Sequence, residues 1–162
     1  MRVALTLMSL LLVAAAASAA DPVYLDELME SPLPRLQTIF TDLRKEGCYQ
    51  IANDRFLLLT IEKKEQKPWR IVLASALPCK RAEPGPTLDV HERSGVELGE
   101  SQTAVVQRLG RPQTAVPADA NMKKFGDFEY FYICRVSENC ARHTSVFFKN
   151  GLVSAIAEWY SQ

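Results

Sequence analysis

The chain has 162 residues and carries 19 Lys and Arg against 19 Asp and Glu, so its formal net charge at pH 7 is zero. Proteins that bind nucleic acid need clustered cationic surface to neutralise phosphates, and this balance argues against that class of partner. The length suffices for one compact domain or two small halves.

Residues 1–20 have the pattern of a secretory signal peptide, with Arg2 as a positive start, an apolar run, and small residues at a cleavage site. The apolar run is short for a membrane span, and an uncleaved anchor is the alternative. We expect cleavage to leave Ala20 or Asp21 as the N-terminus of a periplasmic protein without an integral membrane span. No cysteine follows the site, so we expect no lipid attachment.

Four cysteines follow the signal, at Cys48, Cys79, Cys134 and Cys140. An even number in an exported chain predicts two disulfides, and three connectivities are open. We favour Cys48–Cys79 and Cys134–Cys140, because each pair lies within one half of the chain. No pair has Cys-x-x-Cys spacing, so we expect no metal and no other cofactor.

Two helices are predicted at the start of the mature chain. Asp21-Pro22 can begin the first, with Asp as the cap and Pro in the first turn. Residues 31–34 interrupt it, and a second helix follows that ends at Gly47. The apolar residues of this second helix recur on one face: Leu36, Ile39, Phe40 and Leu43.

Strands are predicted next, because several segments are rich in aromatic and branched residues and are bounded by turn signals. These segments are 48–52, 55–64 and 67–77. Residues 79–87 are dense in Pro, Gly and charge, which makes them the best candidate boundary. We therefore divide the mature chain into an N-terminal half of helices plus strands, residues 21–86, and a C-terminal half, residues 87–162.

The C-terminal half begins with a short strand at 88–92 and a helix capped by Ser101. Gly110 and Pro112 end this helix, since Gly accepts a positive φ and Pro prevents its continuation. Residues 113–124 are predicted to be a loop. Three strands complete the chain: 125–136, 142–150 and 151–162.

Asn150-Gly151 lies between alternating runs and is the strongest hairpin signal, because a type I′ turn needs positive φ at both central residues. In the strand before it, Phe128, Tyr130 and Tyr132 share one face. We expect Val105 and Leu109 of the Ser101 helix to pack on one face of these three strands.

The order of helix, aromatic strand, strand, turn and strand resembles the SmpA/OmlA domain, found in the small lipoprotein of the outer-membrane β-barrel assembly machine and, twice, in the β-lactamase inhibitory protein. The resemblance covers residues 96–160. It is carried by Leu98-Gly99-x-Ser101, Val105, Leu109-Gly110-x-Pro112, Phe128-Glu129-Tyr130 and Val146-Phe147-Phe148-x-Asn150-Gly151-x-Val153.

This resemblance implies an α+β fold in which a C-terminal helix packs on a three-stranded antiparallel meander. The N-terminal helices and antiparallel strands would then be a diverged copy in a tandem pair, or an unrelated addition. By analogy the function is a periplasmic protein-binding module for cell-envelope or outer-membrane assembly or maintenance, with an outer-membrane or periplasmic protein as partner. The alternative is a secreted or periplasmic enzyme inhibitor of the β-lactamase inhibitory protein type, and a small hydrolase is a third class.

The aromatic run and a tryptophan supply the candidate interface: Phe128, Tyr130, Tyr132 and Trp159. Tyr and Trp are favoured at interface centres, and a packed sheet core is the alternative for each of them and for Trp69.

We assign no catalytic residue. The chain has neither Gly-x-Ser-x-Gly nor His-Glu-x-x-His, and a run of Asp89, His91 and Glu92 is more typical of a solvated loop than of an acid/base set.

Overall fold

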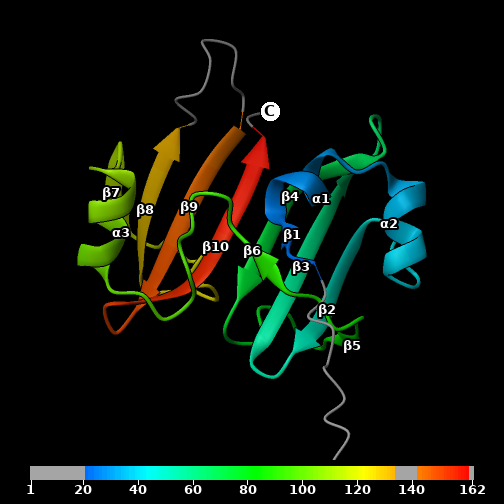
Figure 1. Ribbon diagram of the computed structural model, residues 1–162, viewed down its shortest axis with the longest axis horizontal. Coiled ribbons are helices and arrows are strands. Elements are labelled where there is room, and N and C mark those ends of the chain that lie inside the picture. Colours follow the sequence, from blue (N-terminus) through cyan, green and yellow to red (C-terminus); the bar gives the residue numbers. More distant parts are fainter. Residues whose placement is uncertain (1–20, 134–141, 161–162) are drawn as a thin grey trace, which may run out of the picture.

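The computed structural model describes residues 21–133 and 142–160, which are 43% strand and 16% helix. One sheet of eight strands has the order β5-β2-β3-β4-β10-β9-β8-β7 (Figure 1). The helices are α1 (Leu25–Glu30), α2 (Leu33–Ile39) and α3 (Gln102–Leu109). The strands are β1 (Val23–Tyr24), β2 (Glu46–Ala52), β3 (Arg55–Glu62), β4 (Lys67–Ala74), β5 (Glu83–Pro84), β6 (Val90–His91), β7 (Thr114–Pro117), β8 (Phe128–Ile133), β9 (Arg142–Lys149) and β10 (Leu152–Tyr160).

The predicted α+β fold class, in which a helix packs on a three-stranded meander, is wrong because the protein is mostly β with one large sheet. β8, β9 and β10 do pair in succession, but β10 also pairs with β4, from Ala155 opposite Ala74 to Trp159 opposite Arg70. A separate meander would leave the backbone groups of β10 unpaired at an edge. Pairing with β4 satisfies them and joins both halves of the chain in one sheet.

The predicted start of the first helix at Asp21-Pro22 is also wrong. Val23 and Tyr24 instead form β1, which pairs in parallel with β6, and Val23 donates a backbone hydrogen bond to the Asp89 carbonyl at 2.9 Å. α1 begins only at Leu25. The pairing with β6 holds residues 23 and 24 extended, so the helix cannot include them.

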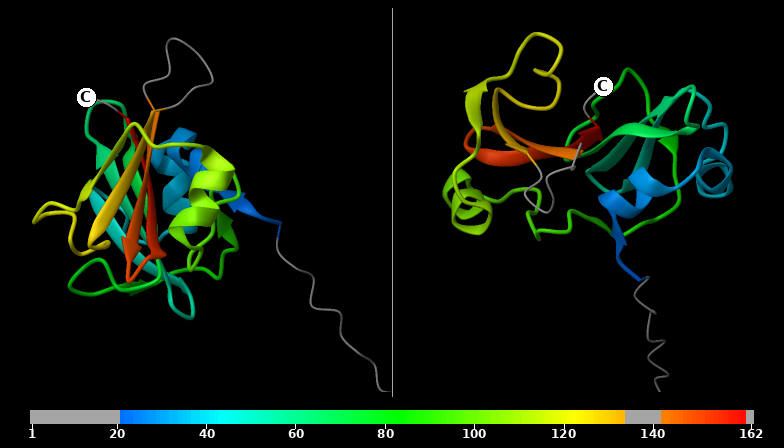
Figure 2. Two further views of the ribbon diagram at one scale, coloured as in Figure 1. Left: turned by 90° about the vertical axis from the view of Figure 1, so that its left-hand side faces the viewer. Right: turned by 90° about the horizontal axis from the view of Figure 1, so that it is seen from above.

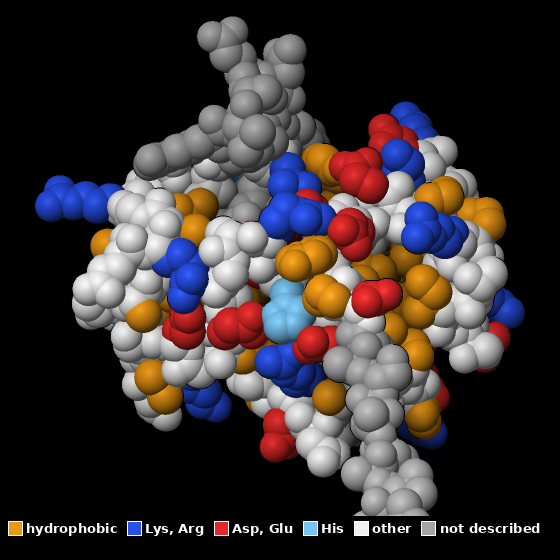
Figure 3. All heavy atoms as spheres, in the orientation of Figure 1, with side chains coloured by type: hydrophobic (Ala, Val, Ile, Leu, Met, Phe, Trp, Pro, Cys, Tyr) orange, Lys and Arg blue, Asp and Glu red, His pale blue; other side chains and the backbone are white. Residues whose placement is uncertain are grey.

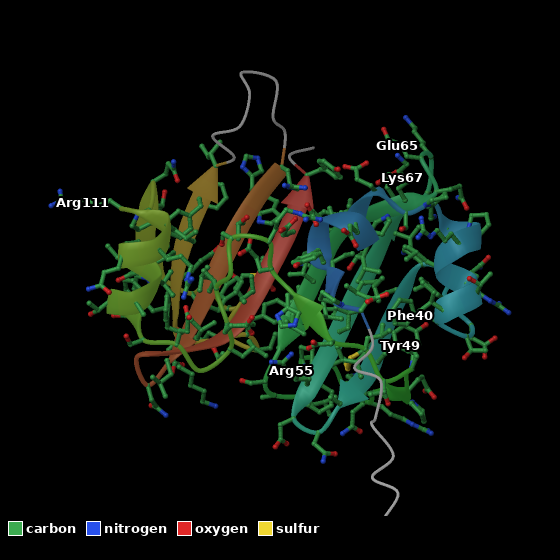
Figure 4. The ribbon with its side chains drawn as sticks, viewed as in Figure 1. Phe40, Tyr49, Arg55, Glu65, Lys67 and Arg111 are labelled. Atoms are coloured by element: carbon green, nitrogen blue, oxygen red, sulfur yellow. A yellow bond between two sulfur atoms is a disulfide. The ribbon has the colours of Figure 1, made fainter. Side chains whose placement is uncertain are left out.

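α2 ends at Ile39 rather than at the predicted Gly47. Gly47 lies inside β2 opposite Leu59, and a Cβ added there would come within 2.5 Å of the Tyr49 side chain. Tyr49 packs against Phe40, with ring centroids 4.8 Å apart (Figure 4). The missing side chain at position 47 therefore permits close packing and does not terminate a helix.

The predicted strands of the N-terminal half are confirmed as the antiparallel series β2, β3 and β4, and the short strand at 88–92 is confirmed as β6. The predicted loop 113–124 is wrong in part, because Thr114–Pro117 form β7 and pair with β8 at the edge of the sheet. The aromatic strand begins at Phe128 and not at Phe125, which is buried against the sheet.

α3 confirms the predicted cap and stop signals. The Ser101 Oγ accepts a hydrogen bond from the Ala104 backbone N–H at 3.2 Å, and Gly110 has a φ of 80°. Val105 is buried and Leu109 is partly buried against the same core. The β9–β10 turn is likewise confirmed, with positive φ at both central residues, Asn150 and Gly151.

The sheet has a different covering on each of its two faces. The three helices and the segment that contains β6 lie on one face, whereas the loop between β7 and β8 lies on the other (Figure 2). We call these the helix face and the helix-free face. The larger core fills the helix face with residues such as Leu36, Leu57 and Ile156. A smaller core on the helix-free face contains Leu58, Val72, Ala74, Phe125, Phe147, Ala155 and Ala157.

The predicted disulfide Cys48–Cys79 is present and ties β2 to the segment after β4. The predicted pair Cys134 and Cys140 lies outside the described residues. Among the residues that the structure describes, no helix has both the length and the apolarity of a transmembrane span.

Candidate functional site

The helix-free face is organised in rows that follow from strand register. Residues that oppose each other in neighbouring strands put their side chains on the same face, so each row crosses the sheet at a right angle to the strands. One row, which we call the Arg70 row, contains Glu46, Thr60, Arg70, Trp159, His143 and Ile133. The adjacent row contains Leu58, Val72, Ala157, Ser145 and Phe131.

An aromatic cleft opens between these rows and the loop that precedes β8. Its volume is about 150 Å³, and its lining includes two small side chains, Ala157 and Ser145. Phe125 lines this space and packs against Phe147, with the two ring centroids 5.4 Å apart and the rings tilted. The cleft is lined by Trp69, Arg70, Met122, Phe125, Glu129, Ser145, Phe147, Ala157 and Trp159.

Three rings form a continuous group beside the cleft. The ring centroid of Phe131 lies 5.1 Å from that of His143 and 5.6 Å from that of Trp159, and the last two are 5.1 Å apart. All three are half-buried, and Ile133 next to them is 43% exposed. The group therefore presents apolar area to solvent without a covering element among the described residues.

Ser145 fixes two of the polar groups at the cleft. Its hydroxyl donates to the Glu129 Oε1 at 2.6 Å and accepts from the Trp159 Nε1–H at 3.3 Å. The Glu129 carboxylate and the Trp159 indole are thus held in place by a side chain that is 1% exposed. A wall fixed in this way loses little conformational entropy when a partner binds.

Three polar atoms of the Arg70 row are buried without a hydrogen-bond partner: Thr60 Oγ1, Arg70 Nε and His143 Nδ1. Buried polar groups normally find a partner, so an unpaired one carries a desolvation cost. Burial also lowers the pKa of Arg70, although Glu46 raises it in opposition. The row is therefore poorly satisfied in the isolated chain.

The structure separates the four predicted interface residues. Phe128, Tyr130 and Tyr132 all lie on the helix face, where they pack against the larger core, and burial raises the pKa of Tyr132 to about 12. Only Trp159 lies at the cleft. The alternation in the sequence correctly assigns Phe128, Tyr130 and Tyr132 to a common face. It carries no signal of which face of the sheet the helices cover.

Sequence reasoning missed Arg70, and it left Trp69 undecided between core and surface. Trp69 is half-buried at the cleft, and the Arg70 guanidinium carbon lies 4.9 Å from its ring centroid. A possible signal is the interruption of the β4 apolar pattern by two large residues, Trp69 and Arg70, at its start. Their link to Trp159 depends on the β4–β10 pairing, which no local pattern reveals.

The acidic run around His91 forms a cluster on the helix face. The His91 Nδ1 lies 2.7 Å from Glu97 Oε1, and its Nε2 lies 2.8 Å from Asp89 Oδ1. These hydrogen bonds raise the pKa of His91 above its usual value. Figure 3 shows red and blue side chains gathered around a pale-blue histidine at the middle of this face. Arg55 joins the cluster from β3 (Figure 4).

The geometry of this cluster favours a structural role over a catalytic one. Both ring nitrogens of His91 are engaged, so neither can accept a proton from a substrate while the contacts last. Glu92, the third residue of that run, instead accepts hydrogen bonds from the Ser94 backbone N–H and hydroxyl. Among the described residues, no group of His, Cys, Asp and Glu could hold a metal ion.

A wider hollow of about 830 Å³ lies beside the disulfide Cys48–Cys79. Its charged lining residues are exposed and of both signs, for example Asp42 and Lys80. Tyr49 is the one aromatic residue in its lining, whereas four aromatic residues line the cleft, so we regard the cleft as the better candidate site.

Comparison with known proteins gives no further guidance: no family model matches the chain, and no significant similarity to a curated protein or to a solved structure is found.

Proposed function

We propose that this protein is an exported, non-enzymatic protein-binding module of the cell envelope, which docks its partner on the helix-free face around the aromatic cleft. The observation that carries the proposal is the cleft itself, whose walls contain two half-buried tryptophans and an arginine. Trp, Tyr and Arg dominate the energetic centres of protein interfaces.

The size of the cleft favours a protein over a small molecule. Small-molecule sites usually enclose roughly 300–1,000 Å³. The aromatic cleft, at about 150 Å³, is well below that range and suits one side chain of a partner. The half-buried rings of Phe131 and His143 would extend the contact across the sheet.

Two other features support the cellular assignment. The Cys48–Cys79 disulfide is typical of proteins that fold in an oxidising compartment. Residues 1–20 have the composition of a signal peptide.

The engagement of both His91 nitrogens supports a protein that binds without catalysing a reaction.

Photo-crosslinking in the cells that produce the protein tests this proposal. A photoreactive phenylalanine analogue replaces Phe131, and a matched probe replaces Arg111, which extends away from the molecule beside β7 (Figure 4). We expect a discrete crosslinked product from position 131 alone, and we expect Trp159→Ala to abolish it. An outer-membrane or periplasmic partner supports the envelope role.

Two results would overturn the proposal in different ways. A stoichiometric complex with a soluble enzyme that loses its activity would replace the envelope role by enzyme inhibition. Equal products from positions 131 and 111, or none from either, would show that the helix-free face is not a docking surface.

A further inference from the structure

Two charged side chains line the aromatic cleft, and they differ in how well they are satisfied. Glu129 already accepts the Ser145 hydroxyl at 2.6 Å. Arg70 makes no hydrogen bond and no ion pair with any acceptor in the described part of the chain, and its Nε is buried. The unmet requirement in the cleft is therefore an acceptor for a guanidinium.

The neighbours of Arg70 reinforce this requirement. Thr60 is its register partner on β3, and the buried Thr60 Oγ1 also lacks a hydrogen-bond partner. Glu46 opposes Thr60 on β2 and influences Arg70 electrostatically, but it forms no ion pair with it. An incoming carboxylate could accept hydrogen bonds from the Arg70 guanidinium, because a carboxylate accepts several hydrogen bonds at once.

We propose that the aromatic cleft binds an apolar side chain that carries or adjoins a carboxylate on the partner, with the apolar part against Trp69 and Trp159 and the carboxylate on Arg70. This inference rests on the docking function proposed above and specifies the chemistry of what docks. It identifies the partner segment as one in which an aromatic or aliphatic group lies beside an acidic group.

A cationic side chain is the competing occupant, since aromatic rings attract cations. Two observations disfavour it. The carboxylate of Glu129 is already engaged by Ser145, and Arg70 in the same cleft would repel a second positive charge.

Three small probes with the same aromatic body separate these occupants: indole-3-acetate, indole-3-acetamide and tryptamine, which carry a negative, zero and positive charge. Each is titrated into the full mature chain while the indole N–H signals of Trp69 and Trp159 and the Nε–H signal of Arg70 are followed by NMR. We expect the acetate to bind most tightly, the amide more weakly and the amine weakest.

Variants of the chain test the role of Arg70 itself. Arg70→Met should weaken acetate binding by about tenfold, the factor expected for one lost hydrogen bond to a charged group, and should leave amide binding unchanged. Arg111→Met, the matched control, should change neither affinity. If Arg70→Met does not fold, the order of the three probe affinities on the unaltered chain still tests the inference.

Each contrary result has one meaning. Equal affinity for the three probes, or tightest binding of tryptamine, overturns the acidic-partner inference and leaves the docking surface intact if position 131 still crosslinks. Absence of any shift at Trp69 and Trp159 with millimolar probe overturns the cleft as a binding site. Absence of a crosslink from position 131 in the chain that keeps Trp159 overturns the docking function independently of these titrations.

Discussion

At the scale of single residues, Glu158 shows the strongest conflict between burial and charge. Its side chain is 2% exposed, and Arg142 Nε lies 3.4 Å from its Oε2. Burial nevertheless raises the pKa of Glu158 to about 7, with smaller contributions in the same direction from Glu92 and Asp26, and Arg142 only partly offsets the rise. The desolvation of a carboxylate here outweighs the attraction of a neighbouring arginine, as expected for a buried ion pair.

This conflict predicts a pH-dependent stability. Because the folded pKa of Glu158 lies above the unfolded value of 4.5, its contribution to stability is present below about pH 4.5 and is lost as the pH rises through about 7. Glu158→Gln mimics the protonated form. We therefore expect the variant to be more stable than the native chain at pH 8, by up to about 3 kcal/mol, and equal to it near pH 4.5.

Urea unfolding at pH values of about 4.5, 6 and 8 provides the measurement, because this range runs from the unfolded pKa of Glu158 to above its folded pKa. Glu65→Gln is the matched control, because Glu65 is exposed at the tip of the β3–β4 hairpin (Figure 4). A Glu158→Gln chain that is less stable than the native one at pH 8 would show that the Arg142 ion pair outweighs the cost of burial.

At the scale of elements, α3 and the β9–β10 hairpin are the parts that local sequence specifies best. Each is delimited by residues whose conformation follows from their own chemistry: the Ser101 cap, and the positive φ of Gly110 and Gly151. Gly151 has a φ of 79° and open space around the position of a Cβ. A substitution there meets no neighbour, so its cost comes from backbone conformation alone.

We expect Gly151→Val to destabilise the fold by about 1 kcal/mol or more, because a β-branched residue is strained at positive φ. Gly151→Asn should cost clearly less, since Asn tolerates the left-handed region. Thermal unfolding of both variants measures the difference. Equal losses for Val and Asn would mean that the turn relaxes to a conformation without positive φ.

At the scale of the whole molecule, the pairing of β4 with β10 makes one sheet of two segments that are distant in sequence. The Cys48–Cys79 disulfide closes a loop of 31 residues within the first segment only. Both tryptophans lie at the cleft beside this pairing, Trp69 on β4 and Trp159 on β10. The sheet should therefore couple the two segments whether or not the disulfide is present.

The double substitution Cys48→Ser with Cys79→Ser should lower the free energy of unfolding by about 4 kcal/mol, the chain-entropy value expected for a loop of this size. We expect the unfolding to remain a single transition, with tryptophan fluorescence and far-ultraviolet circular dichroism changing together. Leu77→Ala, at an exposed position near Cys79, is the control for local perturbation. Two separated transitions would show that the β4–β10 pairing does not couple the segments.

The sequence by itself determined the features that depend on neighbours along the chain. It specified most of the strands, the boundaries of α3 and the β9–β10 turn. Period-2 alternation also sorted the side chains of β8 into two sets. These features were predictable because caps, turns and alternation are local consequences of backbone geometry.

Only the tertiary structure decided the rest, because it depends on which distant segments meet. The β4–β10 pairing overturned the three-stranded meander, and the pairing of β1 with β6 shortened α1. The position of the helices put Tyr130 and Tyr132 in the core and left Trp159 beside Arg70 at the cleft. A residue's own neighbours in sequence fix the face on which its side chain lies, whereas long-range packing fixes whether that face is covered.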